Sequence, residues 1–420
     1  MHIVILGNGI AGITAARHIR KLSDHRITVI SGESDYFFSR PALMYIYMGH
    51  MKKEHTEPYE RWFWKKNRIE LHKGWVEQVV PEKKRLIFAD GSEMHYDKLL
   101  LATGSRPNKF GWPGQDLDGV HGFYSLQDLE AIEYHSKNLQ QAVIVGGGLI
   151  GIELAEMFRS RNIPVIFLVR EKSYWDMVLP PEESEMINRH IREHHIDLRL
   201  ETELKEIWGD EQGKAKMVVT SKGDKIRCGF VGLTAGVHPN VDFLRLSSLE
   251  IDRGILVDEY LQTNIEDIYA AGDCVQLRKP PAGRRPIEAV WYVGRMMGET
   301  AAYNLCGQAR KYEPGTWFNS AKFLDIEYQV YGQLTAHIPE EQATIYWEHS
   351  KEKKSLRIAY DKRTRAVKGF LSMGLRLRHL QCEAWIQSET PVDKVLQNLK
   401  AANFDPEFFP DWSKEPAKLI

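Results

Sequence analysis

Two glycine-rich segments carry residues that are suited to bind a phosphate group. Gly7, Gly9 and Gly12 follow the apolar run 2–6 in the pattern GxGxxG and precede a helix-like stretch that ends near Leu22. In a strand–turn–helix with this spacing, the first glycine permits the tight turn, the second admits a pyrophosphate close to the backbone, and the third lets the helix pack near the strand. The free N–H groups at the helix start stabilise the anion. The residues expected to bind a dinucleotide here are Gly7, Gly9, Ile10, Ala11 and Gly12.

The same arrangement recurs further along the chain. The strand-like run 141–145 leads into the segment 146–151 (GGGLIG) and a helix-like stretch through Phe158, and another strand is expected at 165–169. One GxGxxG match is a weak signal because ordinary turns also use glycine, but two matches in this context indicate two tandem dinucleotide-binding units. The residues expected to bind the second nucleotide are Gly146, Gly148, Leu149, Ile150 and Gly151.

A second repeat supports this organisation. Residues 99–108 (LLLATGSRPN) and 231–240 (VGLTAGVHPN) are both apolar runs that end in glycine and then proline, which is typical of a chain leaving a sheet. Their spacing is close to the spacing of the two glycine loops. Another motif, YAAGD at 269–273, occurs once.

Composition and charge argue against several other classes of protein. The 420 residues include 56 Lys and Arg and 57 Asp and Glu, which gives a formal net charge of −1. This balance removes the main reason to expect a nucleic-acid partner, because such proteins need a basic field. No apolar run reaches the about 18 residues of a membrane span. With no basic leader at the start, we expect a cytoplasmic protein.

The chain has four cysteines, and none of them lies close to another. Cys228, Cys274, Cys306 and Cys382 form no CxxC pair, so the sequence encodes neither a zinc ribbon nor a thioredoxin-type dithiol. Cys274 directly follows Asp273 and could be a redox thiol, and Cys306 ends the helix expected at 289–305. Because free cysteines are commonly buried, we expect both to be small packed residues.

The ordered set of motifs resembles the FAD-dependent pyridine nucleotide oxidoreductases with two dinucleotide-binding domains, the pyridine nucleotide-disulfide oxidoreductase superfamily. The resemblance runs from residue 1 to about residue 310. It implies an α/β fold with two Rossmann-like dinucleotide-binding domains, of which the FAD domain is discontinuous, and a C-terminal α+β interface domain. The implied boundaries are 1–110 and 243–312 for the FAD-binding domain, 111–242 for the NAD(P)-binding domain and 313–420 for the interface domain.

The resemblance also implies roles for residues outside the glycine loops. The first loop would bind FAD and the second NAD(P)H. Asp273 matches the residue that binds the FAD ribityl chain, and Val290 and Trp291 match a helix start that faces the flavin pyrimidine edge. Glu153 matches a carboxylate near the nicotinamide amide. Glu33, which follows the strand expected at 26–30, is a candidate for a ribose hydroxyl. The remaining expected cofactor-binding residues are Arg40, Pro41, Ala102, Thr103, Gly104, Gly236 and Gly272.

The segment 37–43 (FFSRPAL) indicates the subgroup. It resembles a stretch of ferredoxin and rubredoxin reductases, nitrite-reductase-like subunits and apoptosis-inducing-factor-like proteins. Related disulfide reductases carry redox cysteines in this helix, whereas this chain has no cysteine before Cys228. Tyr45 also replaces a lysine that is frequent in the subgroup. We therefore expect hydride transfer between cofactors, with no catalytic protein residue and no redox disulfide.

The nicotinamide cofactor should be selected at the end of the strand 165–169. NAD sites place a carboxylate there, and NADP sites replace it and add an arginine for the 2′-phosphate. By register with the family, Val169 takes the acidic position and Arg170 follows it. This pair favours NADPH, while the adjacent Glu171 and the glycine at Gly151 keep NADH as the alternative.

The resulting hypothesis is an FAD-dependent NAD(P)H oxidoreductase that passes electrons to a small ferredoxin- or rubredoxin-like protein. One alternative is a cysteine-independent NAD(P)H oxidase or quinone reductase. Another is a redox-sensing interaction protein, similar to apoptosis-inducing-factor-like relatives, in which nucleotide binding controls dimerisation. A homodimer through the third domain is compatible with each reading.

Three further segments have both a functional and a structural interpretation. His190 to His194 fits H-x-x-E-H, an inverted zincin pattern, but without a third ligand in the sequence we expect a solvated helix face at 182–195 and no metal. Lysines around Trp62 and Trp64 could receive an acidic redox partner or belong to a half-packed amphipathic helix. Arg284 and Arg285 are a second candidate rim for a partner.

The last hundred residues are predicted to form antiparallel strands followed by a helix. The strands are expected at 323–331, 355–360, 367–373 and 383–386, and the helix at 391–402. The tail aromatics are expected to dock on protein; they are Phe404, Phe408, Phe409 and Trp412.

Overall fold

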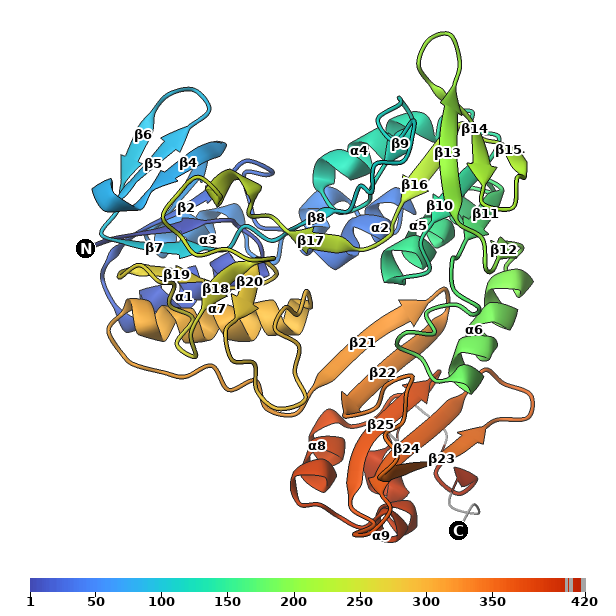
Figure 1. The fold of residues 1–420 in the computed structure, drawn as a ribbon. Helices are drawn as coiled ribbons and strands as arrows, with labels where there is room; N and C mark the ends of the chain where they lie inside the picture. Colours follow the sequence, from blue (N-terminus) through green and yellow to red (C-terminus); the bar gives the residue numbers. More distant parts are fainter. Residues whose placement is uncertain (405–406, 408–410, 417–420) are drawn as a thin grey trace. The chain divides into compact units, whose positions relative to one another are not determined.

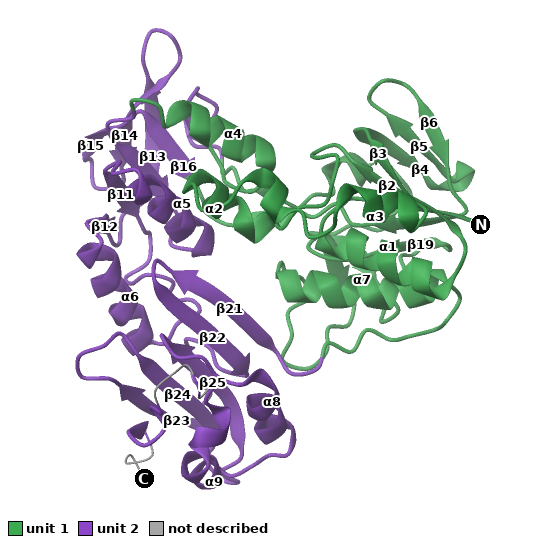
Figure 2. Cartoon of the chain, turned by 180° about the vertical axis from the view of Figure 1, so that it is seen from behind, with its two compact units in different colours: residues 1–110, 121–138, 233–314 green, residues 111–120, 139–232, 315–420 purple. Residues whose placement is uncertain are grey.

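A computed structural model describes residues 1–404, 407 and 411–416 of the chain (Figure 1). Phe408 and Phe409 lie outside these described residues. The described part forms two compact units (Figure 2). Unit 1 contains 1–110, 121–138 and 233–314, and unit 2 contains 111–120, 139–232 and 315–420. Each unit is therefore assembled from segments that are distant in the sequence, and the domain boundaries within the units remain predictions.

Unit 1 is built on a five-stranded parallel sheet with the order β19-β7-β1-β2-β3. The strands are β1 (His2–Leu6), β2 (Arg26–Ser31), β3 (Ile69–Lys73), β7 (Lys98–Leu101) and β19 (Ile268–Ala270). Central strands such as β1 read as continuous apolar runs because both faces of a parallel sheet are covered. Helix α1 (Ile10–Leu22) connects β1 to β2, and α7 (Trp291–Leu305) packs beside α1 (Figure 1).

Smaller elements complete unit 1. The two repeated sequence segments meet in it, because β8 (Ser105–Pro107) and β17 (Val237–Pro239) pair as antiparallel strands. The other strands are β4 (Val76–Val80), β5 (Arg85–Phe88), β6 (Glu93–His95), β18 (Ile255–Val257) and β20 (Val275–Leu277). The helices are η1 (Arg40–Ala42), α2 (Leu43–Tyr47), η2 (Lys53–Thr56), α3 (Arg61–Lys66), η3 (Pro81–Lys83), α4 (Leu126–His135) and η4 (Asp242–Leu244).

Unit 2 contains a second sheet of the same kind, with the order β12-β11-β10-β16-β9. Its strands are β9 (Val120–His121), β10 (Ala142–Val145), β11 (Val165–Leu168), β12 (Asp197–Arg199) and β16 (Phe230–Leu233). Helix α5 (Leu149–Ser160) connects β10 to β11, and α6 (Pro181–Glu193) precedes β12. A small antiparallel sheet is formed by β13 (Leu204–Gly209), β14 (Ala215–Thr220) and β15 (Lys225–Arg227). Two strand–glycine loop–helix–strand repeats confirm the predicted Rossmann-like α/β class.

The C-terminal part of unit 2 is an antiparallel sheet with the order β21-β22-β25-β24-β23. Its strands are β21 (Phe318–Phe323), β22 (Ile326–Gly332), β23 (Gln342–Glu348), β24 (Ser355–Asp361) and β25 (Val367–Met373). Helices α8 (His379–Gln387) and α9 (Val392–Gln397) and the short helix η5 (Leu399–Ala402) follow. The core includes Phe370 and Trp385, and Trp412 from the tail packs against it, as predicted, whereas Phe404 is 37% exposed.

The sequence predictions for this C-terminal part were wrong in three places. The strand expected at 323–331 is a hairpin, because Leu324 adopts a positive φ of 58° and Phe323 pairs with Ile326. Residues 383–386 lie in α8 rather than in a strand. The helix expected at 391–402 ends as an α-helix at Gln397 and continues as η5. Short apolar runs fit helix and strand equally well, and only packing decides between them.

Helix α6 is not a solvated surface helix, which corrects a further expectation. His190 is 1% exposed and Glu183 is fully buried. Arg357 of β24 donates from Nε to Glu183 Oε1 at 2.8 Å, so the helix is tied to the C-terminal sheet of the same unit. Among the described helices, none has the length and hydropathy that a membrane crossing requires.

Candidate cofactor-binding sites

The glycines of the first loop have different surroundings in unit 1. A Cβ on Gly7, whose φ is 120°, would lie 2.0 Å from the Ala102 carbonyl oxygen. A Cβ on Gly12 would lie 2.0 Å from the carbonyl oxygen of Gly7. Gly9 is the N-cap of α1, and a Cβ there would meet nothing within 4 Å. The outer two glycines are therefore needed for packing, while the middle one borders free space where a phosphate can approach.

Close packing between α1 and α7 brings the remaining flavoprotein motifs to this loop. A Cβ on Gly298 of α7 would lie 2.2 Å from the Ala11 carbonyl oxygen. A Cβ on Gly272 would lie 3.0 Å from the Ala11 Cβ, and one on Gly294 would lie 3.3 Å from Ile10 Cγ2. These contacts place the start of α7, with Val290 as its N-cap, near the first glycine loop. The motifs at 7–12, 272–273 and 290–291 thus converge.

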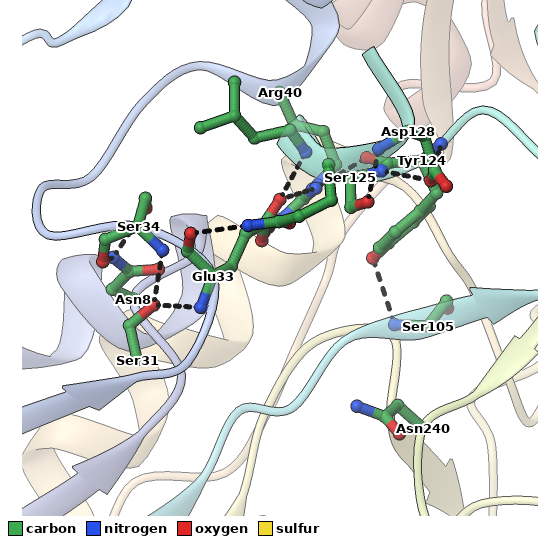
Figure 3. Close-up of polar contacts among 12 residues, drawn as sticks. Asn8, Ser31, Glu33, Ser34, Arg40, Ser105, Tyr124, Ser125, Asp128 and Asn240 are labelled. Carbon is green, nitrogen blue, oxygen red and sulfur yellow. Dashed lines mark hydrogen bonds and ion pairs between the residues drawn. The ribbon is translucent and has the colours of Figure 1, made fainter. Parts of the chain in front are cut away.

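A polar cluster that the sequence analysis missed ties the loop after β2 to the glycine loop (Figure 3). Asn8 is buried and donates from Nδ2 to the carbonyl oxygen of Ser34 at 3.0 Å and to its Oγ at 3.1 Å. Ser31 Oγ accepts from the backbone N–H groups of Glu33 and Ser34, each at 3.2 Å. Asn8 stands at an x position of the GxGxxG pattern, so the motif could not predict its role.

Glu33 and Arg40, both predicted site residues, form a bidentate ion pair (Figure 3). Glu33 Oε1 also accepts the backbone N–H of Leu126 at 2.9 Å, at the start of α4. Arg40 donates to the Tyr124 carbonyl oxygen at 2.6 Å and its guanidinium lies 4.5 Å from the Tyr124 ring centroid. Glu33 Oε2 accepts only from Arg40 among the described residues, so one lone pair of this oxygen remains for a ribose hydroxyl.

Asp273 lies in a second network of unit 1. Ser105 Oγ and the Tyr124 hydroxyl donate to Asp273 Oδ2 at 3.3 Å and 3.4 Å, respectively. Burial raises the pKa of the Asp273 carboxyl. The Tyr124 hydroxyl in turn accepts the Ser105 N–H at 3.0 Å (Figure 3). Tyr124 therefore joins the Arg40 and Asp273 networks, although no motif in the sequence indicated it.

The predicted residues of the crossover segment are held by its repeat. Thr103 Oγ1 donates to the Asn240 carbonyl oxygen at 2.8 Å, and Asn240 Nδ2 donates to the Thr103 carbonyl oxygen at 3.2 Å. Gly104 and Gly236 both have positive φ, 70° and 85°, which a residue with a side chain rarely adopts. Pro41 lies in η1, directly after Arg40.

The second glycine loop has a similar construction in unit 2. Gly146 has a φ of 116° and donates its N–H to Leu168 in β11. Gly148 is the N-cap of α5, and a Cβ there would meet nothing within 4 Å, as for Gly9. The buried Tyr174 donates its hydroxyl to the Gly148 carbonyl oxygen at 3.0 Å. Leu149, Ile150 and Gly151 form the first turn of α5.

Glu153 on α5 has the character of a functional carboxyl group. Burial, and to a smaller extent the neighbouring Glu156 carboxylate, raises the pKa of Glu153 to about 7. Lys322 of β21 donates to Glu156 Oε1 at 2.8 Å and partly offsets this effect. A carboxyl group with such a pKa can be neutral or charged near neutral pH, as is typical of groups in ligand sites.

The end of β11 has no acidic side chain at the predicted specificity position. Val169 is fully buried and packs on the glycine loop, since a Cβ on Gly147 would lie 2.8 Å from Val169 Cγ1. The Arg170 side chain is 66% exposed and pairs with Glu171, with Nη2 and Oε1 3.0 Å apart. Exposed pairs of this kind contribute little free energy, about 0–1 kcal/mol, so Arg170 can exchange Glu171 for another anion.

The four cysteines are free thiols, and three of them are buried. Burial raises the pKa of the Cys228 thiol to about 12 and also raises the pKa of the Cys274 and Cys382 thiols. Cys274 follows Asp273 but contacts the carbonyl oxygens of Leu101 and Ala271, each at 3.5 Å. The thiolate form that redox exchange requires is thus disfavoured at these positions.

Comparison with known proteins agrees with this geometry. Residues 1–298 match the family described as pyridine nucleotide-disulphide oxidoreductase. The chain belongs to this family. It is therefore an oxidoreductase that uses FAD and NAD(P)H, as the motifs predicted.

Individual members of the pyridine nucleotide-disulphide oxidoreductase family are similar over most of their length. The chain is 31% identical to rhodocoxin reductase of Rhodococcus erythropolis over 333 residues, which cover 77% of this chain and 76% of the relative. It is 30% identical to an NADH oxidase of Methanocaldococcus jannaschii over 341 residues, with coverages of 78% and 75%. A ferredoxin reductase from Rhodopseudomonas palustris has the same fold, with a TM-score of 0.82, 23% identity and 99% coverage of both chains. The roles of single residues remain predictions.

Proposed function

We propose that this oxidoreductase delivers electrons from NAD(P)H, through FAD, to a small iron–sulfur or rubredoxin-like protein without using a protein disulfide. The observation that carries the proposal is the state of its cysteines. No cysteine precedes Cys228, and the buried thiols have raised pKa values. Similarity to rhodocoxin reductase supports a small redox protein as the acceptor.

The chain's own residues would bind and orient the two cofactors. Bound FAD supplies a ring that accepts a hydride as two electrons and can release electrons singly. Gly9 and Gly148 border the free space at the starts of α1 and α5, where N–H groups stabilise pyrophosphate. The 15-residue helix α7 starts at Trp291, and its first N–H groups would stabilise negative charge on a reduced ring.

NADPH is the nicotinamide cofactor that the residues at the end of β11 favour. The buried Val169 cannot accept hydrogen bonds from ribose hydroxyls, and the exposed Arg170 can bind a 2′-phosphate with two N–H groups. Glu171 competes for Arg170 but can also rotate towards solvent. We therefore expect a higher kcat/KM with NADPH than with NADH.

Anaerobic reduction followed by a panel of acceptors tests the proposal. The holoenzyme should be reduced by NAD(P)H and should then reduce ferredoxin- or rubredoxin-type proteins in repeated turnovers. Alkylation of accessible thiols should leave the turnover rate unchanged. Reduction without transfer to any iron–sulfur protein or one-electron dye would contradict the proposal.

An NAD(P)H oxidase is the second candidate, because an NADH oxidase is among the relatives of about the same identity. Rapid oxygen consumption without an added carrier would favour it, and rapid quinone reduction would favour the related quinone reductase. Slow reoxidation combined with nucleotide-dependent dimerisation would instead favour an interaction protein.

A further inference from the structure

Two histidines of α6 and one aspartate of the β21–β22 turn converge in unit 2. One nitrogen each of His190 and His194 and one carboxylate oxygen of Asp325 lie within 4.8 Å of one another. His190 is buried, whereas the side chains of His194 and Asp325 are 38% and 75% exposed. The sequence analysis identified the two histidines of H-x-x-E-H but found no third donor, because Asp325 lies more than 130 residues further along the chain.

The hydrogen bonding of His194 leaves a lone pair directed at this carboxylate. His194 Nδ1 lies 3.0 Å from the His190 carbonyl oxygen, which can only accept, so Nδ1 carries the ring proton. In the neutral ring Nε2 is then unprotonated, and it lies 3.6 Å from Asp325 Oδ1. An imidazole lone pair and a carboxylate oxygen at this distance can share a cation.

His190 directs its Nε2 to the same oxygen. This atom touches Asp325 Oδ1 but makes no well-aligned hydrogen bond among the described residues. Two imidazole nitrogens and one carboxylate oxygen are the donor set of many zinc sites, and they favour zinc over calcium or magnesium. We propose that His190, His194 and Asp325 form a binding site for a divalent transition-metal ion of the zinc type.

The site requires movements of the Asp325 and Lys353 side chains. Ligand atoms at about 2.1 Å from a tetrahedral zinc ion lie about 3.4 Å apart, which is close to the separation of His194 and Asp325. The contact between Asp325 and His190 must open, and Asp325 can move because it lies in an exposed hairpin turn. The Asp325 side chain is 75% exposed, so an ion can reach it from solvent.

The surroundings also provide a partner for the far side of the His190 ring. Lys353 now donates to His190 Nδ1 at 2.6 Å. When Nε2 binds a metal, the proton of the neutral ring resides on Nδ1, so Lys353 must withdraw from it. Glu193 Oε2, 4.0 Å from Nδ1, is then available as an acceptor, and Lys353 already pairs with this carboxylate. A carboxylate behind a metal-binding histidine is a common supporting interaction.

Such an ion would join α6 to the β21–β22 hairpin within unit 2. It would bind the folded chain and not the unfolded one, and therefore raise Tm. This role is independent of the proposed electron transfer, so it can hold or fail without affecting that proposal.

Zinc binding to the tag-free, EDTA-treated holoenzyme tests the site, with equilibrium dialysis and the Tm as readouts. Wild type should bind one Zn²⁺ tightly and gain Tm. His194→Gln and Asp325→Asn should bind at least about ten-fold more weakly and gain none. His195→Gln, which changes the exposed neighbouring histidine, should behave like wild type.

Circular dichroism and the zinc-free Tm establish that the variants fold. Absence of tight binding to wild type would overturn the proposal. Equal binding by all four proteins would overturn it as well, because the zinc would then bind elsewhere.

Discussion

The Arg40 guanidinium meets the Glu33 carboxylate through two parallel hydrogen bonds, Nη1 to Oε1 at 2.9 Å and Nη2 to Oε2 at 2.6 Å. The side chains are 29% and 20% exposed, respectively, so the pair is partly desolvated. Because Glu33 also receives the Leu126 N–H at the start of α4, this contact joins three segments of unit 1 beside the first glycine loop.

Arg40→Ala should therefore weaken both folding and flavin retention. Loss of one partner leaves the Glu33 carboxylate without its main donor, and we expect a loss of about 1–3 kcal/mol, below the cost for a fully buried pair. Arg26→Ala is a matched control, because the Arg26–Glu70 pair is more than half exposed and should contribute about 0–1 kcal/mol. Tm and the FAD content after gel filtration measure both effects. Equal losses in the two variants would contradict the prediction.

Glu153 should make the stability of the nucleotide-free chain depend on pH. Its pKa is raised from 4.5 to about 7 by burial, so between these pH values the folded state holds a proton that the unfolded state has released. The folded state binds more protons in this window, and its stability therefore falls as pH rises from about 4.5 to 7. The full effect is on the order of 3 kcal/mol.

Glu153→Gln should remove this contribution. The Tm of the variant relative to wild type should rise from pH 5 to pH 8 and then level off. Glu211→Gln, an exposed substitution in the β13–β14 turn, should show a constant difference from wild type over the same range. A Glu153→Gln profile parallel to wild type would show that this carboxyl is ionised throughout.

Arg170→Ala should change cofactor selection. Loss of a bidentate contact to the 2′-phosphate should lower kcat/KM for NADPH about ten-fold, or about 1.4 kcal/mol, and leave kcat/KM for NADH nearly unchanged. Lys172→Ala removes an exposed charge two residues away and serves as the control. If Arg170→Ala lowers both values equally, Arg170 does not select the cofactor.

Lys66→Glu should slow electron delivery to an acidic acceptor. In α3, Trp64 is 3% exposed and Trp62 is 57% exposed, and Lys66 Nζ lies 5.1 Å from the Trp62 ring centroid. The helix is thus half packed and still presents an aromatic and basic face. Lys83→Glu changes net charge equally on another exposed segment.

The bimolecular rate with the acceptor should fall more for Lys66→Glu than for Lys83→Glu, and the difference should shrink as salt rises. Equal effects of the two substitutions would mean that the rate depends on the net charge of the protein and not on the position of Lys66. The second candidate rim is corrected at Arg284 only, because its side chain is 5% exposed and pairs with Glu288, whereas Arg285 is exposed.

Local sequence patterns were sufficient for the glycine loops. Gly7 and Gly146 require a positive φ, Gly9 and Gly148 begin helices, and strands of apolar residues precede both loops. These features depend on neighbours in the chain, so a motif can predict them.

The sequence motifs did not predict the features that depend on residues distant in the chain. Tyr124 connects Arg40 with Asp273, and Asp325 meets the two histidines of α6, only because the fold brings these segments together. The hairpin at Leu324 was also not predicted, because the apolar residues of its two strands continue the alternating pattern of a single strand.

The packing of α7 on α1 has a consequence for synthesis of the chain. A carbonyl oxygen of α1 lies where a side chain at Gly298 would be, so the two helices fit closely, yet α7 is made long after α1. At about 5–20 residues per second, translation leaves the α7-facing surface of α1 uncovered for tens of seconds. A nascent chain that stalls before Trp291 would therefore expose this surface to chaperones and proteases.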